Sequence, residues 1–241
     1  MVLTRETITV GSQRFRVTPW HAQPGVAQLS MPPRQAAPPT EAIRVVLDTL
    51  AGRGCTRVIT AAMSESETTA FDALGFVEDD RLHVLEYDLD RPRGDRPGRS
   101  REVRVKRPAR ADRAGALDLD AAAFDPFWRL DSHGLADAEH ATPHSRFRVA
   151  SVEGDLAGYA ITGRGGGSGF LQRLATRPDM QRRGVATTLV RDSLRWCERH
   201  GCRQVYVNTQ VINSAALALY RSIGFERTQH DLVVLSWSAD A

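Results

Sequence analysis

The sequence predicts an α/β (α+β) protein whose central mixed sheet is flanked by helices. Two observations carry this prediction: strand patterns alternate with single helices along residues 102–241, and residues 1–90 repeat part of that order. No apolar run approaches the roughly 20 residues that a membrane span needs, and no signal-peptide core begins the chain. We therefore expect a cytoplasmic protein without membrane contact. The formal net charge of +3 is too small to indicate a nucleic-acid partner.

Residues 102–241 contain the clearer order of elements. Expected strands alternate apolar and polar side chains, expected helices place apolar side chains on one face, and glycines follow the last two helices. The expected elements are a strand at 103–105, a helix at 109–124, a mixed loop to 143, a hairpin of strands at 147–151 and 156–162, a glycine-rich turn at 163–169, a strand at 170–176, a helix at 185–200, a strand at 205–210, a helix at 213–223 and a strand at 232–237.

A basic stretch divides the chain. Residues 91–101 have the proline, glycine and charge content of a linker, so we expect one domain over 1–90 and a second over 102–241. Arginines continue as far as Arg113, and a solvated charge run is the favoured interpretation. Docking of an acidic partner or nucleic acid is the alternative, but the run lacks interleaved aromatic side chains.

Residues 1–90 resemble an incomplete copy of the second part. Aligning Gly54-Cys55 with Gly201-Cys202 places the expected helix at 40–50 on 187–197, and after a two-residue gap 74–76 falls on 223–225. Common helix–strand grammar is the alternative explanation, but self-similarity of this order favours duplication. The copies differ where chemistry would lie, because Phe71 corresponds to Tyr220. The first copy is therefore expected to be structural.

Residues 181–186 have the composition of a diphosphate-binding loop. Diphosphate binding needs converging backbone N–H groups, preferably at the positive end of a helix dipole. Gly184 permits close backbone approach, and Ala186 keeps the next turn small. A charged helix start with an incidental glycine is the plainer alternative. The neighbouring side chains that add positive charge or a hydroxyl donor are Arg182, Arg183 and Thr187.

Two motifs in the expected order resemble a known family. The Gln-x-x-Gly-x-Ala segment at 181–186 resembles the acetyl-CoA signature of the GCN5-related N-acetyltransferase (GNAT) superfamily, and 213–225 resembles that family's second motif. The resemblance covers roughly residue 102 to the C-terminus and, in decayed form, residues 1–90. It implies a GNAT fold preceded by a partial GNAT-like repeat, a layout similar to tandem members such as mycothiol synthase.

The resemblance also implies a co-substrate and roles for individual residues. Acetyl-CoA would be the acyl donor, and no metal is expected, because the three cysteines lack zinc-ligand spacing. The backbone N–H of Leu174 or a near neighbour would polarise the thioester carbonyl. Tyr220 would be the catalytic acid, since a phenol can donate a proton without being ionised at neutral pH. The residues implied to bind the cofactor are Leu174, Ala175, Thr176, Gln181, Arg182, Arg183, Gly184, Val185, Ala186, Thr187, Asn213 and Tyr220.

Plain structural roles remain open for several of these residues. Tyr220 fits a core aromatic and Asn213 a helix N-cap. Phe127 and Trp128 are expected to bind the acceptor, with packing of a helix end as the alternative. Asn208 stands where many family members carry a glutamate, which leaves the general base open. Weaker candidates for the general base are Asp131, His133 and Glu139, with a water chain as the alternative.

The expected function is therefore transfer of an acetyl group from acetyl-CoA to a primary amine by direct attack in a ternary complex. The acceptor is a small molecule, a protein N-terminus or a lysine, and the protein is expected to be a monomer or homodimer. A catalytically inactive acyl-CoA-binding or interaction module is the alternative, motivated by Asn208. A further hypothesis gives the first copy an interaction role, covering the acceptor groove or mediating dimers.

Overall fold

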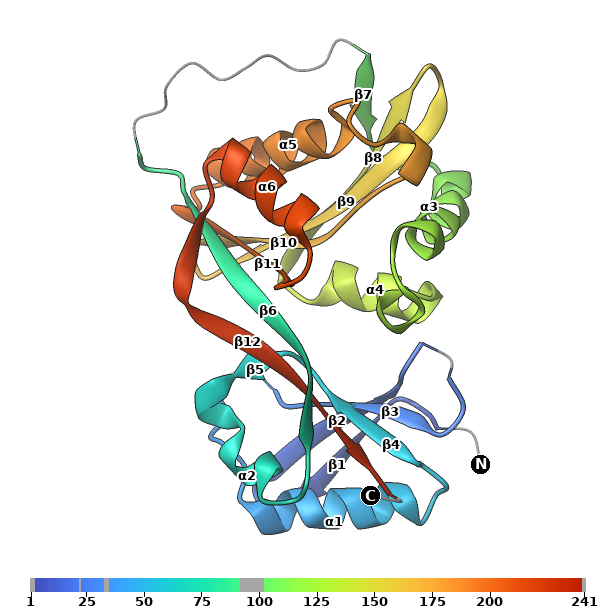
Figure 1. Cartoon of the computed structure of the whole chain (residues 1–241), viewed down its shortest axis with the longest axis vertical. Helices are drawn as coiled ribbons and strands as arrows, with labels where there is room; N and C mark the ends of the chain where they lie inside the picture. The colour runs from blue at the N-terminus through green and yellow to red at the C-terminus, as the bar shows by residue number, and fades with distance from the viewer. Residues whose placement is uncertain (1–2, 22, 33–34, 92–101, 240–241) are drawn as a thin grey trace. The chain divides into compact units, whose positions relative to one another are not determined.

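The computed structural model describes residues 3–21, 23–32, 35–91 and 102–239 (Figure 1). The backbone forms two compact units, one of Met1–His83, Gln210–Ile212 and Gln229–Ala241, the other of Val84–Thr209 and Asn213–Thr228. The expected linker at 91–101 lies outside the described residues, apart from Arg91. The expected domain boundaries, 1–90 and 102–241, stay a prediction. None of the helices in the described ranges is long and apolar enough to cross a membrane.

The first unit contains antiparallel strands that continue into a parallel pair. Its elements are β1 (Glu6–Val10), β2 (Gln13–Pro19), β3 (Val26–Ser30), α1 (Thr40–Ala51), β4 (Arg57–Thr60), β5 (Met63–Ser64), the 3₁₀ turn η1 (Glu65–Glu67) and α2 (Thr69–Asp72). β2 pairs antiparallel with β1 and β3, whereas β3 pairs parallel with β4 across the crossover helix α1. Ile43, Val46 and Leu50 lie at helical spacing on α1 and join the apolar core. Burial of each such side chain contributes about 1.5–3 kcal/mol.

The second unit is a mixed sheet with the strand order β6-β11-β10-β9-β8-β7. Its elements are β6 (Val77–Asp88, of which Val84 onward belongs here), β7 (Val103–Lys106), α3 (Arg110–Ala123), the 3₁₀ turn η2 (Pro126–Trp128), α4 (Ser132–His140), β8 (His144–Val152), β9 (Asp155–Gly165), β10 (Ser168–Thr176), the 3₁₀ turn η3 (Pro178–Met180), α5 (Val185–Arg199), β11 (Gln204–Gln210) and α6 (Ser214–Ile223). β8, β9 and β10 are antiparallel, while β10 and β11 are parallel. The predicted α/β class with a central mixed sheet is confirmed.

Helices cover both faces of the sheet in the second unit (Figure 1). α5 and α6 lie on one face, where Ala160 of β9 shares an apolar cluster with Leu189 of α5. α3 and α4 lie on the other face, where Tyr159 and Ile161 share a second cluster with Leu119 of α3. The separation follows from the alternation of side chains along a strand.

Each unit completes its sheet with a strand from the other half of the sequence. In the first unit β12 (Glu226–Ser238) pairs antiparallel with β4 and β5, for example Ser236 with Ile59. In the second unit the part of β6 from Val84 onward lies beside β11. A strand at 232–237 was expected, but its pairing with the first half of the chain could not be read from its apolar pattern, which lacks any information on partners.

The two halves of the sequence end their helices with the same geometry. Gly54 and Gly201 both adopt left-handed backbone angles, with φ of 84° and 75°. The amide of the next residue then donates a hydrogen bond to a carbonyl oxygen of the last helical turn. The bond is 3.0 Å long for Cys55 and 3.1 Å long for Cys202. This is the helix ending that glycine favours, because it has no Cβ to clash.

The aromatic pairs that follow are also shared. Phe71 packs edge-on against Phe76 with ring centroids 5.2 Å apart, and Tyr220 packs against Phe225 at 5.5 Å. In each pair the second amide donates to the carbonyl of the first residue. These matches, together with the extra strands of the first half, confirm a partial repeat.

One expected loop is a helix. The segment up to residue 143 contains α4, so the mixed-loop prediction was wrong there. The Asp131 carboxylate caps this helix by accepting a 2.7 Å hydrogen bond from the amide of Gly134. Gly134 is a poor helix former, and it obscured a helix that the cap and the packing of Leu135 stabilise. The glycine turn is also shorter than expected, because β9 and β10 extend to Gly165 and from Ser168.

Candidate active site

β10 and β11 separate partway along their length. Their parallel pairing covers three residue pairs, from Ser168–Gln204 to Phe170–Tyr206, although β10 continues to Thr176. A register shift between Leu171 and Arg173 marks a bulge in β10. A bulge bends the strand and increases its local twist. The backbone of β10 beyond the bulge is therefore no longer occupied by β11, and a ligand can pair with it.

Three of the predicted cofactor residues lie on β10 beyond the bulge. Leu174, Ala175 and Thr176 pair on their other edge with Ala160, Tyr159 and Gly158 of β9. The hydroxyl of Thr176 is buried and has no hydrogen-bond partner among the described residues. Because a buried hydroxyl without a partner costs free energy, this atom is suited to a ligand contact.

The predicted diphosphate loop leads directly into α5. Arg182 has φ of 63° and Gly184 has φ of 79°, and Gly184 is the N-cap of the helix. Left-handed residues alternating with other conformations turn successive N–H groups toward one side, which creates an anion-binding concavity. No acidic side chain lies in the first turn of α5. The positive end of the helix dipole is therefore not neutralised locally.

The side chains around this loop have different surroundings. Val185 is buried in the core, whereas Ala186 and Thr187 are partly exposed and Gln181 is exposed. The guanidinium of Arg183 contacts Glu153 at 3.1 Å and the sulfur of Met180 at 3.3 Å. Its side chain is thus engaged by the β8–β9 turn, so any cofactor contact from Arg183 falls to its backbone amide.

Gly158 allows the end of β10 to approach the start of α5. A Cβ atom at this position would lie 2.8 Å from the carbonyl oxygen of Ala175 and 2.8 Å from Cγ1 of Val185. Both distances are below any normal carbon contact, so a larger residue would push the strand and the helix apart. The absence of a side chain here keeps the two backbone segments of the candidate site together.

Asn213 and Tyr220 belong to α6, which contacts α5. The Asn213 side-chain oxygen accepts a 3.0 Å hydrogen bond from the amide of Ala216, so the residue is the N-cap. Its side-chain NH₂ group is not used by that cap. Tyr220 is 5% exposed, and burial raises the pKa of its phenol above the usual value. The phenol therefore keeps its proton at neutral pH, as a general acid must.

A buried ion pair that the sequence analysis did not identify lies on the opposite face of β10. Arg173 donates two hydrogen bonds of 2.8 Å to the carboxylate of Asp120 on α3, which is fully buried. Tyr159 donates to the same carboxylate. Burial and the charge of Asp120 raise the pKa of Tyr159, so its phenol remains a donor. The signal for this ion pair in the sequence was Asp120, a charged residue within the apolar stripe of a predicted helix.

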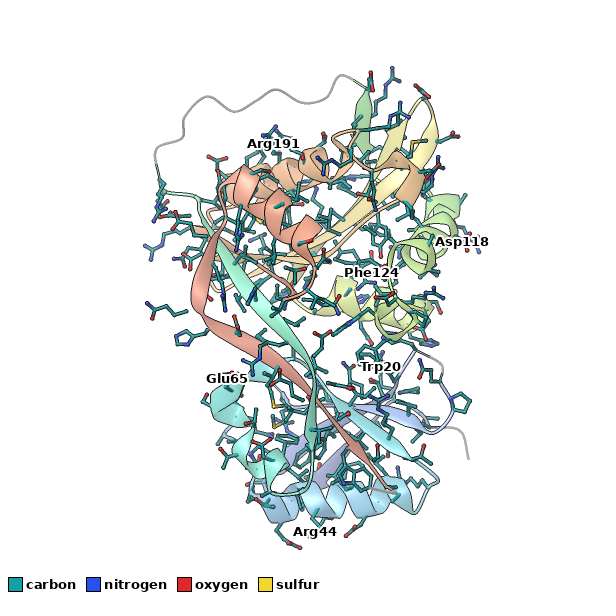
Figure 2. The ribbon with its side chains drawn as sticks, viewed as in Figure 1. Trp20, Arg44, Glu65, Asp118, Phe124 and Arg191 are labelled. Carbon is teal, nitrogen blue, oxygen red and sulfur yellow. The ribbon has the colours of Figure 1, made fainter. Side chains whose placement is uncertain are left out.

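The same ion pair holds the loop expected to contact the acceptor. Arg173 donates at 2.8 Å to the carbonyl of Trp128, and the amide of Leu130 donates at 2.8 Å to Asp120. The Cζ atom of Arg173 also lies 3.6 Å from the ring centroid of Phe124. Phe124 is labelled in Figure 2 and directly follows α3. Phe127 packs edge-on against Trp128 in η2, with ring centroids 5.1 Å apart. η2 is therefore tied to the strand that carries the predicted thioester contact.

The carboxylates considered as general bases from the sequence are largely occupied. Glu139 forms a paired contact with Arg113, at 2.6 and 2.8 Å. Asp131 caps α4. Asn208 is exposed on β11. Both oxygens of Glu139 are thus paired with Arg113, whereas Asp131 uses one oxygen for its cap.

A different carboxylate, Glu86, lies next to β11. It belongs to β6 and accepts a 2.7 Å hydrogen bond from the side chain of Gln204. Burial and the nearby charge of Glu86 raise the pKa of Tyr206, whose ring stacks on Phe170 where β10 and β11 stop pairing. Glu86 lies far from both motifs in the sequence, and only the pairing of β6 with β11 brings it here.

A mixed sheet with a bulged strand diverging from its parallel neighbour, beside a glycine-capped helix, defines the GNAT fold. The chain belongs to the GNAT acetyltransferase family. The model of the Acetyltransferase (GNAT) family matches residues 115–225, a range that contains every predicted cofactor residue.

Two N-acetyltransferases are similar to part of the chain. N-alpha-acetyltransferase RimI of Mycobacterium tuberculosis is 35% identical over 124 residues, which cover 49% of this chain and 75% of that protein. The [ribosomal protein bS18]-alanine N-acetyltransferase of Escherichia coli strain K12 is 31% identical over 106 residues, or 39% of this chain and 72% of that protein. These relatives indicate an acyltransferase.

Solved structures show the fold over nearly the whole chain. A GCN5-related N-acetyltransferase from Sphaerobacter thermophilus has a TM-score of 0.66 at 17% identity, covering 94% of this chain and 76% of that one. A tandem GNAT protein from the clavulanic acid biosynthesis pathway has a TM-score of 0.65 at 15% identity, covering 94% and 79%. The tandem layout predicted from the sequence is thereby supported at the level of the fold.

Proposed function

We propose that the protein transfers an acetyl group from acetyl-CoA to a primary amine by direct attack in a ternary complex. One observation carries this proposal: β10 parts from β11 after Phe170, next to the left-handed loop that begins α5. The separated part of β10 leaves strand backbone available for an extended arm that carries amides, and the loop offers N–H groups to a diphosphate. CoA carries both an amide-bearing arm and a diphosphate.

The proposed roles follow from these positions. Backbone amides from Arg182 to Thr187 hold the pyrophosphate, and the N–H of Leu174 or a neighbour polarises the thioester carbonyl. The amine nitrogen attacks the carbonyl carbon, and the C–S bond breaks as the tetrahedral intermediate collapses. Tyr220 gives its proton to the departing thiolate. The proton lost by the amine leaves through a base or water and balances the one that Tyr220 must regain.

The acceptor that we favour is the α-amine of a protein N-terminus. This follows from the names of the two relatives, which are N-terminal or alanine N-acetyltransferases. Phe127 and Trp128 are the proposed acceptor contacts, since partly exposed aromatic rings on a fixed turn suit recognition of a peptide. Lysine side chains and small amines are the alternative acceptors to be compared with it.

A second candidate function is acyl-CoA binding without catalysis. Asn208 favours it, because an amide cannot accept a proton from the attacking amine as a carboxylate can. Glu86 favours the enzyme instead, because it places a carboxylate beside β11.

Two measurements on the full chain separate the candidates. Acetyl-CoA should raise the unfolding temperature, and thiol release should follow when N-terminal peptides, lysine peptides and small amines are added. We expect the fastest release with peptides that carry a free N-terminal amine. The same peptides with a blocked N-terminus are the matched control. Stabilisation by acetyl-CoA without thiol release from any amine would establish the binding module, and no stabilisation at all would refute both candidates.

A further inference from the structure

A cluster of arginines lies on the α5 face of the sheet, away from the cofactor loop. Arg146 and Arg148 alternate along β8, and Arg164 lies on β9, where it pairs with His144. Arg146 pairs with Thr162, whose hydroxyl bonds to Ser193 of α5. Side chains two residues apart on a strand point to the same face. All three arginines therefore point toward α5.

The second half of α5 completes the cluster. Asp192, Arg195, Trp196 and Arg199 recur at helical spacing, so they form one stripe of the helix. Trp196 lies eleven residues after the first residue of α5, which corresponds to about 16 Å along the helix axis. The cluster is therefore distinct from the loop at residues 181–187.

Two guanidinium groups share one indole ring. The Cζ atom of Arg146 lies 5.9 Å from the ring centroid of Trp196, and that of Arg164 lies 5.8 Å from it. Each contact is attractive. The indole ring of Trp196 is thus a shared contact for two positively charged side chains.

The carboxylate within the cluster balances only part of this charge. Asp192 accepts a 2.6 Å hydrogen bond from Arg146, and both side chains are largely buried, at 14% and 13% exposure for Arg146 and Asp192. Arg195 approaches the same carboxylate at 4.0 Å. Glu198 is the other acidic residue in this part of α5 and is exposed. Arg148 and Arg164 add further positive charge, and within the described part of the chain neither forms an ion pair with Asp192.

Buried donors point to a missing acceptor. The Nε atoms of Arg146 and Arg164 are both buried, and neither has a hydrogen-bond partner among the described residues. Burial and the charges of Arg148 and Arg199 lower the pKa of Arg146 against the effect of Asp192. Burial likewise lowers the pKa of Arg148; the charge of Asp192 opposes this effect and the charge of Arg107 adds to it. A buried charged donor without a partner is costly, and an oxyanion would satisfy it.

We propose that Arg146, Arg148 and Arg164, supported by Trp196, form a second anion site that binds a phosphate oxyanion. A phosphate group carries about −1.5 to −2 charges at pH 7 and three acceptor oxygens. Each planar guanidinium group can donate a pair of hydrogen bonds to those oxygens. A single carboxylate has fewer acceptor oxygens and satisfies fewer of these donors. The site does not depend on acetyl transfer, and inorganic phosphate or a phosphorylated small molecule would share the same chemistry.

Thermal unfolding of the full chain tests the site with inorganic phosphate, pyrophosphate and ATP as probes. Sodium chloride at equal ionic strength controls for screening. Each titration is made with saturating CoA, which occupies the cofactor loop. We expect phosphate to stabilise the CoA-loaded protein. ATP should stabilise it more than phosphate does if the natural ligand is a nucleotide, and equally if only the oxyanion is recognised.

Arg164→Gln is the informative variant, because Arg164 makes no ion pair with Asp192 that its loss would break. It should weaken phosphate binding about tenfold or more, since one hydrogen bond to a charged group is worth at least that factor. Its CoA binding should be unchanged. Arg44→Gln, on the outer side of α1 (Figure 2), is the matched surface control and should bind phosphate normally.

Four results would overturn the proposal. One is equal stabilisation by phosphate and chloride, which would show that water or screening satisfies the cluster. Another is equal phosphate binding by Arg164→Gln and Arg44→Gln. A third is a phosphate effect that CoA abolishes, which would place the anion in the cofactor loop. Tight binding of a short RNA duplex without any response to phosphate would also overturn it, in favour of a nucleic-acid surface. Arg148→Gln provides the same test if Arg164→Gln does not fold.

Discussion

Arg173 on β10 and Asp120 on α3 form a paired, buried ion bridge, with both hydrogen bonds at 2.8 Å. Arg173 also donates to the carbonyl of Trp128 and so connects β10, after its bulge, to that residue. This ion pair therefore sets the distance between β10, which carries the proposed thioester contact, and η2, which carries the proposed acceptor contacts.

Asp120→Ala should destabilise the protein by about 3–5 kcal/mol, because it leaves the Arg173 guanidinium buried without its counter-charge. Denaturant unfolding measures this loss. In the fraction that remains folded, the KM for the acceptor should rise more than the KM for acetyl-CoA, since η2 loses its anchor. Asp118→Ala is the control, because Asp118 points away from the sheet on the same helix (Figure 2) and its loss should cost under about 0.5 kcal/mol. Equal effects from the two variants would contradict the anchoring role.

Tyr220→Phe should retain acetyl-CoA binding and lower kcat by about 10²–10⁴, the usual contribution of a general acid. Calorimetric titration measures the binding and thiol release measures the turnover. Tyr87→Phe is a suitable control, since Tyr87 also packs against Phe225, with ring centroids 5.2 Å apart. Unchanged turnover in Tyr220→Phe would remove this phenol from the chemistry.

Burial of Tyr220 also predicts a change in stability with pH. The phenol ionises near pH 10 in the unfolded chain, whereas the raised pKa keeps it neutral in the folded state. Above pH 10 the unfolded state thus releases a proton that the folded state retains, and the free energy of unfolding falls as pH rises. The fall is up to about 1.4 kcal/mol per pH unit for one group.

Tyr220→Phe should remove that contribution. Unfolding curves at pH 8 and pH 11 should therefore show a smaller loss of stability in the variant than in the unmodified protein. Other titrating groups are common to both proteins and cancel in the difference. Identical pH dependence would show that the phenol ionises as readily in the folded state.

Gly184→Ala should weaken acetyl-CoA binding. The left-handed φ of 79° strains any residue with a Cβ, at a cost of order 1–3 kcal/mol, and the methyl group would obstruct backbone contact with the diphosphate. Gly154→Ala imposes similar strain at φ of 101° in the β8–β9 turn, with open space around the added atom. Both variants should lose stability, but only Gly184→Ala should raise the dissociation constant. If both bind acetyl-CoA equally well, the loop is not the diphosphate site.

Glu86→Gln should lower kcat by about 10²-fold if this carboxylate accepts the proton of the attacking amine. The amide keeps the shape of the side chain and can still bond to Gln204, so acetyl-CoA binding should be unaffected. Asp88→Asn, two residues along the same strand, is the matched control and should be neutral. A Glu86→Gln enzyme with normal turnover would leave a water chain as the proton path.

The parts of the candidate site that depend on neighbours along the chain could be predicted from the sequence. The loop at 181–186, the Asn213 cap and the glycine helix endings are local motifs, since each needs a particular residue at a particular backbone angle. The repeat was visible for the same reason, because Gly54 and Gly201 terminate their helices identically. The α4 helix escaped because Gly134 lowered its intrinsic propensity while tertiary packing of Leu135 stabilised it.

The sequence by itself thus determined the family and the mixed α/β class, and it predicts the cofactor loop at 181–186; all three depend on short-range pattern and backbone conformation. Only the tertiary structure decided which distant residues meet: Arg173 with Asp120, Glu86 with Gln204, and Arg146 with Asp192. A charged side chain looks the same in a sequence whether it is solvated or paired in a core. Strand register and helix packing determine its partner, and those depend on contacts between segments far apart in the chain.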